Sequence, residues 1–357
     1  MEIQLNSTTG KLQNFIEVKE WAHVSKARRE AARRATEIGF SETAVAEISI
    51  IVSELAENLI SHHAVDGKII LSKLTVNEQI GLQIIAEDRG PGIENINRAI
   101  TDGYSENASL GIGLGAVKRL SDEFEVISKT KRVNRAIYEN YRENIGTIVI
   151  SRKWLNRDHP HKYQPGNGYR FGIMSRPKIG ETSNGDSWFL KEFNGQVMIA
   201  VFDGLGHGED AAIASLKACA VLNANFEEPL DKLLHRVHVE LHRTRGAVGS
   251  IALINEKAAW LEYAGIGNIW AQVFNAPQPV RPVNFNGILG SNLEKVKVFH
   301  FAWHKGNILM MSSDGISDKF TPDSYPGLLT KHPMIIADLV LRDYGRNSDD
   351  ATVIVAG

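Results

Sequence analysis

SELAENLISHH, at residues 53–63, is the stretch that says most about the fold, because it places a carboxylate and an amide on one side of an apolar helix. Glu54 and Asn58 stand four residues apart, so both side chains project from the same helix face. Another face carries apolar residues at alternating steps of three and four, which predicts a stripe against a core. These residues are Val45, Ile48, Val52, Leu55 and Leu59. The polar face is therefore available for another task.

The residues around this helix predict an α/β layer. Gly39 separates it from a preceding basic helix, as a glycine at a helix C-terminus commonly does. Apolar runs bounded by turn residues predict the strands. The expected elements are a strand at 11–19, helices at 21–38 and 41–61, strands near 67–76 and 80–87, a short helix through residue 120, and strands near 124–128 and 147–152.

Two glycine-rich segments follow the helices. EDRGPGI, at residues 87–93, places Asp88 after a strand, and SLGIGLGAVKR, at residues 109–119, leads into a helix. Glycines let backbone N–H groups approach a phosphate closely, and a helix N-terminus favours negative charge. Each piece alone is a weak signal, since most glycine loops are only turns. The order of all three pieces is what points to a nucleotide.

In that order, the motifs resemble those of the Bergerat-fold (GHKL) ATPases, and especially the RsbT-like switch serine kinases and anti-sigma kinases of bacterial partner switching. The resemblance covers nearly all of residues 10–153. It implies an α/β sandwich that binds ATP with Mg²⁺. Glu54 would be the general base, Asn58 would bind the Mg²⁺ on the ATP phosphates, and Asp88 would accept from the adenine amino group. The pocket and its lid would be completed by Gly90, Gly92, Gly111, Gly113, Gly115 and, near adenine, Thr147.

Two features of this half lie outside the motifs. Residues 129–146 form an insert relative to the small kinases, which is interpreted either as a surface loop or as a docking element. The basic segment SKARREAARRATEIG, at residues 25–39, could attract an anionic surface. Because Glu30 and Glu37 interrupt it, the solvated face of a helix is the favoured interpretation.

A polar, proline-containing stretch at residues 155–168 predicts a linker between a domain at 1–154 and a second at 169–357. Beyond it, short β-like runs near 169–175, 187–202, 248–274, 296–302 and 307–311 surround helical patterns near 208–225 and 229–243. This half predicts a β-rich layered domain with helices.

Aspartates in this second half stand beside strand-like runs. They are Asp186 in SNGDSWF, Asp203 with Gly204 in VFDGLGHG, Asp314 in SSDGISD and Asp349 in NSDDATV. Only a β-layer that brings strand ends together could make them neighbours. Carboxylates clustered without Cys or His suit hard cations such as Mg²⁺ or Mn²⁺.

These motifs, with SRPKIGETSNGDSWF and GIGNI, resemble those of the PPM metal-dependent serine/threonine phosphatases, in the SpoIIE and RsbX branch, over residues 169–356. The resemblance implies an α/β/β/α sandwich with two Mn²⁺ or Mg²⁺ ions. Asp203 would bridge the ions and so be catalytic, and the Gly204 carbonyl would help to bind one ion. Asp186, Asp314 and Asp349 would complete the shells, with Asp350 as an alternative to Asp349. Such a site would activate a water for attack on phosphorus.

Composition sets the remaining limits. The 357 residues predict two domains, and 40 Lys plus Arg against 42 Asp plus Glu give a net charge of −2, which does not favour nucleic acid as the main partner. The single cysteine excludes an intrachain disulfide. No apolar run approaches the roughly 20 residues of a membrane span. A cytoplasmic protein is therefore expected.

The two resemblances together predict a bifunctional protein serine/threonine kinase and phosphatase. By resemblance, the substrate would be a STAS-domain antagonist or a stressosome scaffold protein, and a sigma factor or a downstream phosphatase could be a further partner. Two alternatives remain open: a phosphatase whose first domain only senses ATP, and a first domain that sequesters a sigma factor or antagonist without phosphorylating it. Glu54 favours the kinase, since a sensor needs no base.

Overall fold

The computed structural model describes residues 15–76, 79–101, 113–130, 146–155 and 169–357. The described residues divide into two compact units, an N-terminal unit within 15–155 and a C-terminal unit at 169–357. Most of the predicted linker, and the insert within 129–146 except for its ends, lie outside the described residues. Leu155 belongs to the N-terminal unit, because its backbone N–H donates to the Ile80 carbonyl at 2.8 Å and its side chain packs on that unit's core.

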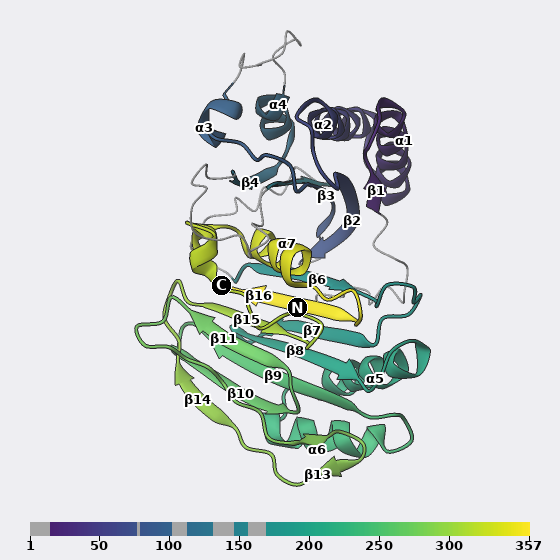
Figure 1. The fold of residues 1–357 in the computed structure, drawn as a ribbon. Coiled ribbons are helices and arrows are strands. Elements are labelled where there is room, and N and C mark those ends of the chain that lie inside the picture. The colour runs from purple at the N-terminus through teal and green to yellow at the C-terminus, as the bar shows by residue number, and fades with distance from the viewer. Residues whose placement is uncertain (1–14, 77–78, 102–112, 131–145, 156–168) are drawn as a thin grey trace, which may run out of the picture. The chain divides into compact units, whose positions relative to one another are not determined.

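The N-terminal unit is a five-stranded antiparallel sheet with helices on one face (Figure 1). The strand order is β1-β2-β3-β5-β4. Its apolar core lies between the sheet and helices α1, α2 and α4. The elements are β1 (Phe15–Glu17), α1 (Trp21–Ile38), α2 (Glu42–Ser61), β2 (Lys68–Val76), β3 (Gln79–Glu87), α3 (Ile96–Ala99), α4 (Gly113–Leu120), β4 (Glu123–Lys129) and β5 (Gly146–Trp154).

Helix α2 forms as the sequence predicts. The Ser41 hydroxyl caps its N-terminus by accepting from the Ala44 N–H at 3.3 Å, and Gly39 ends α1 in the left-handed conformation with φ of 102°. Four of the five predicted stripe residues are buried, and Val45 is half-buried against the same core. This packing fixes the orientation of the other face of α2, which carries Glu54 and Asn58.

A buried ion pair ties α2 to the sheet. The Lys153 side chain on β5 is only 1% exposed, and its Nζ lies 2.5 Å from Glu47 Oε2 on α2. The same Nζ donates to the Leu120 carbonyl at the end of α4, at 2.6 Å. Without Glu47, this buried charge would face only the more distant Asp122 carboxylate, at 3.8 Å, so the contact holds α2, α4 and β5 in one arrangement.

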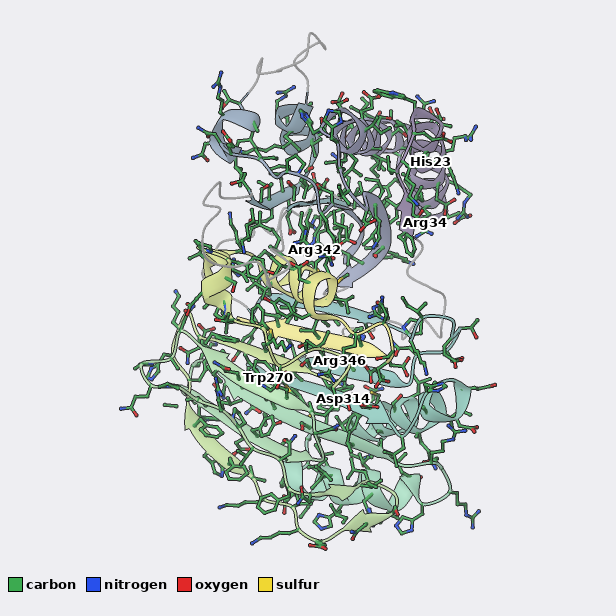
Figure 2. All side chains as sticks on the ribbon, in the orientation of Figure 1. His23, Arg34, Trp270, Asp314, Arg342 and Arg346 are labelled. Atoms are coloured by element: carbon green, nitrogen blue, oxygen red, sulfur yellow. The ribbon has the colours of Figure 1, made fainter. Side chains whose placement is uncertain are left out.

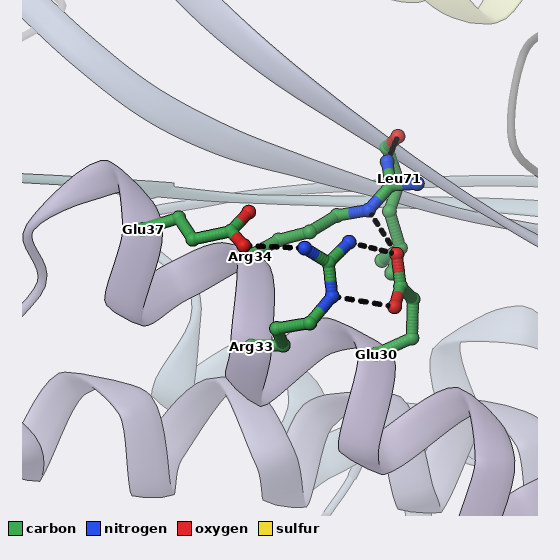
Figure 3. A network of polar contacts seen from close by, with 5 residues as sticks. All are labelled: Glu30, Arg33, Arg34, Glu37 and Leu71. Atoms are coloured by element: carbon green, nitrogen blue, oxygen red, sulfur yellow. Dashed lines mark hydrogen bonds and ion pairs between the residues drawn. The ribbon is translucent and has the colours of Figure 1, made fainter.

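Two of the four arginines of α1, Arg33 and Arg34, are paired within the helix (Figure 3). Arg33 and Arg34 both donate to Glu30, Arg33 also pairs with Glu37, and Arg34 reaches the Leu71 carbonyl on β2 at 2.7 Å. The arginines, Arg33 first, lower the pKa of Glu30 to about 2. Lys26, Arg28 and Arg29 are exposed, so the segment is a solvated helix face, in agreement with the favoured interpretation.

The C-terminal unit has four layers (Figure 1). One sheet has the order β14-β10-β9-β8-β7 and the second β11-β15-β16-β6. Apolar side chains of both sheets share one core, helices α5 and α6 pack on the outside of the first sheet, and α7 packs on β6 and β16 of the second. This is the α/β/β/α sandwich expected from the sequence.

The strands of this unit are β6 (Phe171–Arg176), β7 (Asp186–Phe193), β8 (Gln196–Gly204), β9 (Ala247–Asn255), β10 (Trp260–Ile266), β11 (Trp270–Phe274), β12 (Gly287–Ile288), β13 (Asn292–Leu293), β14 (Phe299–Ala302), β15 (Ile308–Ser312) and β16 (Ala351–Ala356). The helices are α5 (Glu209–Asn225), α6 (Leu230–Leu241) and α7 (Pro333–Tyr344), with short 3₁₀ turns at Pro322–Ser324 and Leu328–Thr330. The run expected near 187–202 is a hairpin of two strands. Among the described residues, no helix is long and apolar enough to cross a membrane.

Candidate functional site

The polar face of α2 carries the first candidate site. Glu54 and Asn58 are both half-buried, one helical turn apart. Burial, followed by repulsion from Glu57, raises the pKa of the Glu54 carboxyl above its ordinary value. A carboxylate with a raised pKa is a better proton acceptor, which is what a general base requires.

Asp88 and Thr147 are neighbours across the β3–β5 pair. The Asp88 N–H donates to the Thr147 carbonyl at 3.0 Å, and one Asp88 carboxylate oxygen accepts from the Gly90 N–H at 2.6 Å. The Thr147 hydroxyl lies 2.8 Å from that of Ser128, which also accepts from the Ile93 N–H at 2.7 Å. The strand register thus brings the Asp88 carboxylate close to the Thr147 and Ser128 hydroxyls. The sequence motifs identified Asp88 and Thr147 but not Ser128.

The loop after Asp88 lies against the end of α2. The Arg89 N–H donates to the Val65 carbonyl at 2.7 Å, and a Cβ on Gly90 would lie 3.1 Å from the Ala64 Cα. On the other side, a Cβ on Gly92 would lie 2.4 Å from the Lys129 carbonyl oxygen. Both predicted glycines are therefore needed for close backbone packing around Asp88.

Helix α4 brings the second glycine segment to the same unit. Gly113 begins α4 and Gly115 is buried within its first turns, where α4 packs against α2. Gly111 lies outside the described residues. Gly113 and Gly115 thus lie in the same helix layer over the sheet as the α2 face that carries Glu54 and Asn58.

The second candidate site begins at the β7–β8 hairpin. The antiparallel register places Asp186 directly opposite Asp203, so their carboxylates are cross-strand neighbours. A Cβ on Gly204 would lie 2.1 Å from the Ala211 carbonyl oxygen, so only glycine lets α5 pack this closely. The hairpin therefore places the Asp186 and Asp203 carboxylates near the start of α5.

Further aspartates join this pair. Burial raises the pKa of Asp203 strongly, and repulsion from four aspartates raises it further. These four are Asp186, Asp314, Asp349 and Asp350. Asp350 is buried and accepts from the Lys178 N–H at 2.8 Å, whereas Asp349 is half-buried and accepts from the Asp350 N–H at 3.0 Å. Both neighbours in the DD pair thus lie at the cluster.

The donor set fits hard divalent cations. Asp186 Oδ1 and Asp350 Oδ2 are buried and have no hydrogen-bond partner, which is costly unless a cation binds there. Within the described ranges, no three His, Cys, Asp or Glu side chains are arranged to hold one ion alone. Mg²⁺ keeps several water ligands and takes only one or two carboxylates, so this sparser arrangement suits it.

The sequence reasoning missed the residues that orient these aspartates. The Ser313 hydroxyl donates to Asp186 Oδ2 at 2.6 Å, and Asn268 Nδ2 donates to Asp314 Oδ2 at 2.8 Å (Figure 2 labels Asp314). Ser313 precedes Asp314, and Asn268 belongs to GIGNI, so both lay within motifs that were already identified. Nothing in those motifs assigned the hydrogen bonds, because the partners are distant in sequence.

Comparisons with known proteins agree with the two units. Residues 18–137 match the family described as the histidine kinase-like ATPase domain. The serine/threonine-protein kinase RsbT of Bacillus subtilis is 42% identical over 136 residues, which are 38% of this chain and 91% of RsbT. Through its N-terminal unit, the chain belongs to the RsbT family.

The C-terminal unit is similar to proteins of a phosphatase family. Residues 194–357 match the family described as stage II sporulation protein E (SpoIIE). The phosphoserine phosphatase RsbX of Bacillus subtilis is 27% identical over 142 residues, 39% of this chain and 71% of RsbX. A solved structure described as belonging to the bacterial stressosome is 30% identical and has a TM-score of 0.51, and the match covers 53% of this chain and all of that one. The chain is thus a fusion of kinase-family and phosphatase-family domains.

Proposed function

We propose that this chain is a two-way switch that phosphorylates a serine or threonine of a STAS-domain antagonist or stressosome scaffold protein and also removes that phosphate. A dianionic phosphate at a protein interface can expel a partner, and its removal restores docking. A sigma factor or a downstream phosphatase would be released or bound in turn. Because ATP is the proposed donor, we place this activity in the cytoplasm.

The proposed phosphatase activity rests on the buried aspartate cluster, in which two carboxylate oxygens have no hydrogen-bond partner. In this proposal, Asp203, Asp186, Asp314, Asp349 and the Gly204 carbonyl hold two ions, with Asp350 in the same cluster. Bound cations of this kind supply a nucleophilic water at neutral pH and neutralise charge on the phosphoryl group. The protein's own groups hold the cluster together, since Ser313 and Asn268 fix two of the carboxylates.

The kinase half rests on α2 and the Asp88 loop. In this proposal, Asn58 holds the Mg²⁺ on ATP, Asp88 and Thr147 receive the adenine, and Glu54 accepts the proton of the acceptor hydroxyl. Gly90, Gly92, Gly111, Gly113 and Gly115 form the pocket and its lid. Phosphoryl transfer needs chiefly positioning, a metal and a base, and these groups supply all three.

The direct test uses the full-length protein with two probes. Mg-ATP binding is measured by calorimetry, and release of phosphate from a phosphoserine peptide is measured with Mn²⁺ and then with excess chelator. We expect ATP binding and chelator-sensitive hydrolysis. No ATP binding at millimolar Mg-ATP would refute both the kinase and the ATP-sensor alternatives, and full hydrolysis in chelator would refute the metal centre.

Gly146→Ala tests the Asp88 subsite. Gly146 has a φ of 121°, and a Cβ there would lie 2.0 Å from the Asp88 carbonyl oxygen, so the substitution must displace Asp88. We expect Mg-ATP binding to weaken by about tenfold or more in a calorimetric titration. Gly39→Ala is the matched control, because Gly39 also has a positive φ but its Cβ would meet only Leu155, at 4.0 Å. Equal ATP affinity in the two variants would contradict the placement of adenine.

The pH dependence tests Glu54. Only the ionised carboxylate can accept a proton, so the kinase rate should rise as the pH passes through the raised pKa of Glu54. Glu57→Gln removes the repulsion that helps to raise this pKa, so the acid limb of the rate profile should move to lower pH. The measurement is phosphorylation rate against pH for both proteins, with Mg-ATP affinity as the control. A limb that stays in place or moves to higher pH would argue against Glu54 as the base.

A further inference from the structure

Arg346 lies on the turn that follows α7 and precedes the Asp349–Asp350 pair. Its backbone is fixed on both sides, because its N–H donates to the Gly315 carbonyl at 2.7 Å and its carbonyl accepts from Arg176 Nη2 at 2.7 Å. The Asp349 N–H also points to this carbonyl, at 3.4 Å. The Cα of Arg346 is therefore held at a defined place beside the aspartate cluster.

The Arg346 side chain is exposed and contacts Asp314 (both are labelled in Figure 2). Its Nη1 donates to the Asp314 carbonyl at 2.9 Å. Burial and Asp349 raise the pKa of the Asp314 carboxyl, and the hydrogen bond from Asn268 and the charge of Arg346 oppose that rise. A guanidinium has five N–H donors, and among the described residues the Arg346 guanidinium donates only to this backbone carbonyl. Most of its hydrogen-bonding capacity is thus unused at the edge of the cluster.

Three other cationic side chains near the cluster are already engaged. Arg176 donates to the carbonyls of Pro177, Arg346 and Asp349. Arg245 pairs with Asp210 at 2.8 Å, and His207 Nδ1 lies 2.7 Å from Glu181 Oε1. Arg176 is held by three backbone carbonyls, and Arg245 and His207 each face a carboxylate, whereas the Arg346 side chain makes a single hydrogen bond.

We propose that Arg346 binds the phosphoryl oxygens of the phosphorylated protein substrate, which is a phosphate monoester dianion. A guanidinium can donate two parallel hydrogen bonds to two phosphate oxygens. The hydrogen bond to the Asp314 carbonyl holds the Arg346 guanidinium beside the aspartate cluster, where the phosphoryl group must bind. The inference rests on the proposed phosphatase function. It adds a substrate-binding residue outside the carboxylate set.

The test compares the full-length protein with Arg346→Met. Two quantities are measured: the Kd of inorganic phosphate by calorimetry in Mg²⁺, and the KM for a phosphoserine peptide in Mn²⁺. We expect both to rise by about 10- to 100-fold, the range for a charge-assisted hydrogen bond, while the affinity for Mn²⁺ does not fall. Arg236→Met is the matched control, because Arg236 is exposed and pairs only with Glu228 on the outside of the same unit. It should leave both quantities unchanged.

Other outcomes overturn the inference. If Arg346 only supports the turn, Arg346→Met would weaken Mn²⁺ binding and lower Tm but leave the Kd of phosphate unchanged. If the methionine variant does not fold, Arg346→Lys serves instead, since it keeps the charge but loses the two-pronged contact. We expect lysine to weaken phosphate binding less than methionine, and an unchanged Kd would overturn the inference. Absence of hydrolysis by the wild type would instead refute the proposed function, and the phosphate Kd would still test Arg346.

Discussion

Asp203→Asn is expected to lower the rate of phosphoserine hydrolysis by at least about 100-fold while ATP-dependent phosphorylation continues. The substitution keeps the shape of the side chain and removes the charge at the centre of the aspartate cluster. That charge faces Asp186 across the β7–β8 hairpin and is the one most affected by the other aspartates. The measurement is release of phosphate from a phosphoserine peptide by the full-length protein in Mn²⁺.

Asp210→Asn is the matched control for this substitution. Asp210 stands in the first turn of α5, close in sequence to Asp203, but it is exposed and pairs with Arg245. An exposed pair of this kind contributes little, so hydrolysis should stay near the wild-type rate. Wild-type hydrolysis by Asp203→Asn would show that the metal centre is assigned to the wrong residues.

Asn58→Ala is expected to reduce phosphorylation of a protein substrate by about 100-fold or more and to leave phosphoserine hydrolysis intact. The amide oxygen of Asn58 projects from the same face of α2 as Glu54, and without it the Mg²⁺ on ATP loses its proposed protein ligand. Incorporation of phosphate from labelled ATP measures the effect.

Ser49→Ala on the same helix is the control for Asn58→Ala, because the Ser49 hydroxyl only donates to the Val45 carbonyl one turn earlier, at 2.7 Å. It should phosphorylate normally. If the first unit is only an ATP sensor, a different pattern is expected: no variant phosphorylates a partner, and Asn58→Ala changes the hydrolysis rate only when ATP is present.

Much of the fold follows from local sequence. Alternating apolar steps predicted α2, and Gly39 and Ser41 marked the end of one helix and the start of the next. In the C-terminal unit, the sequence pattern predicted a β-like run near 187–202 without its turn, which lies at Asn194 and Gly195 with φ of 49° and 74°. An Asn-Gly pair is a strong hairpin signal. Counting outward from it pairs Asp186 with Asp203, so the sequence already contained this register.

The remaining parts of the candidate sites could not be predicted in the same way. Asn268 meets Asp314 and Ser313 meets Asp186 only because separate strands of the sandwich end together. The separations along the chain are 46 and 127 residues, far beyond any local pattern. Arg346 likewise gains its position from contacts with Gly315 and Arg176. Side-chain types were therefore predictable, whereas their partners depend on the packing of distant segments.

The most direct test of two opposing activities in one chain is phosphate incorporation into a single purified STAS-domain protein from the same organism. Labelled ATP, Mg²⁺ and Mn²⁺ are supplied, and wild type, Asn58→Ala and Asp203→Asn are compared over time. The account predicts strong accumulation of labelled partner with Asp203→Asn, a lower steady level with wild type, and almost none with Asn58→Ala. Equal labelling by wild type and Asp203→Asn, or no labelling by Asp203→Asn, would contradict it.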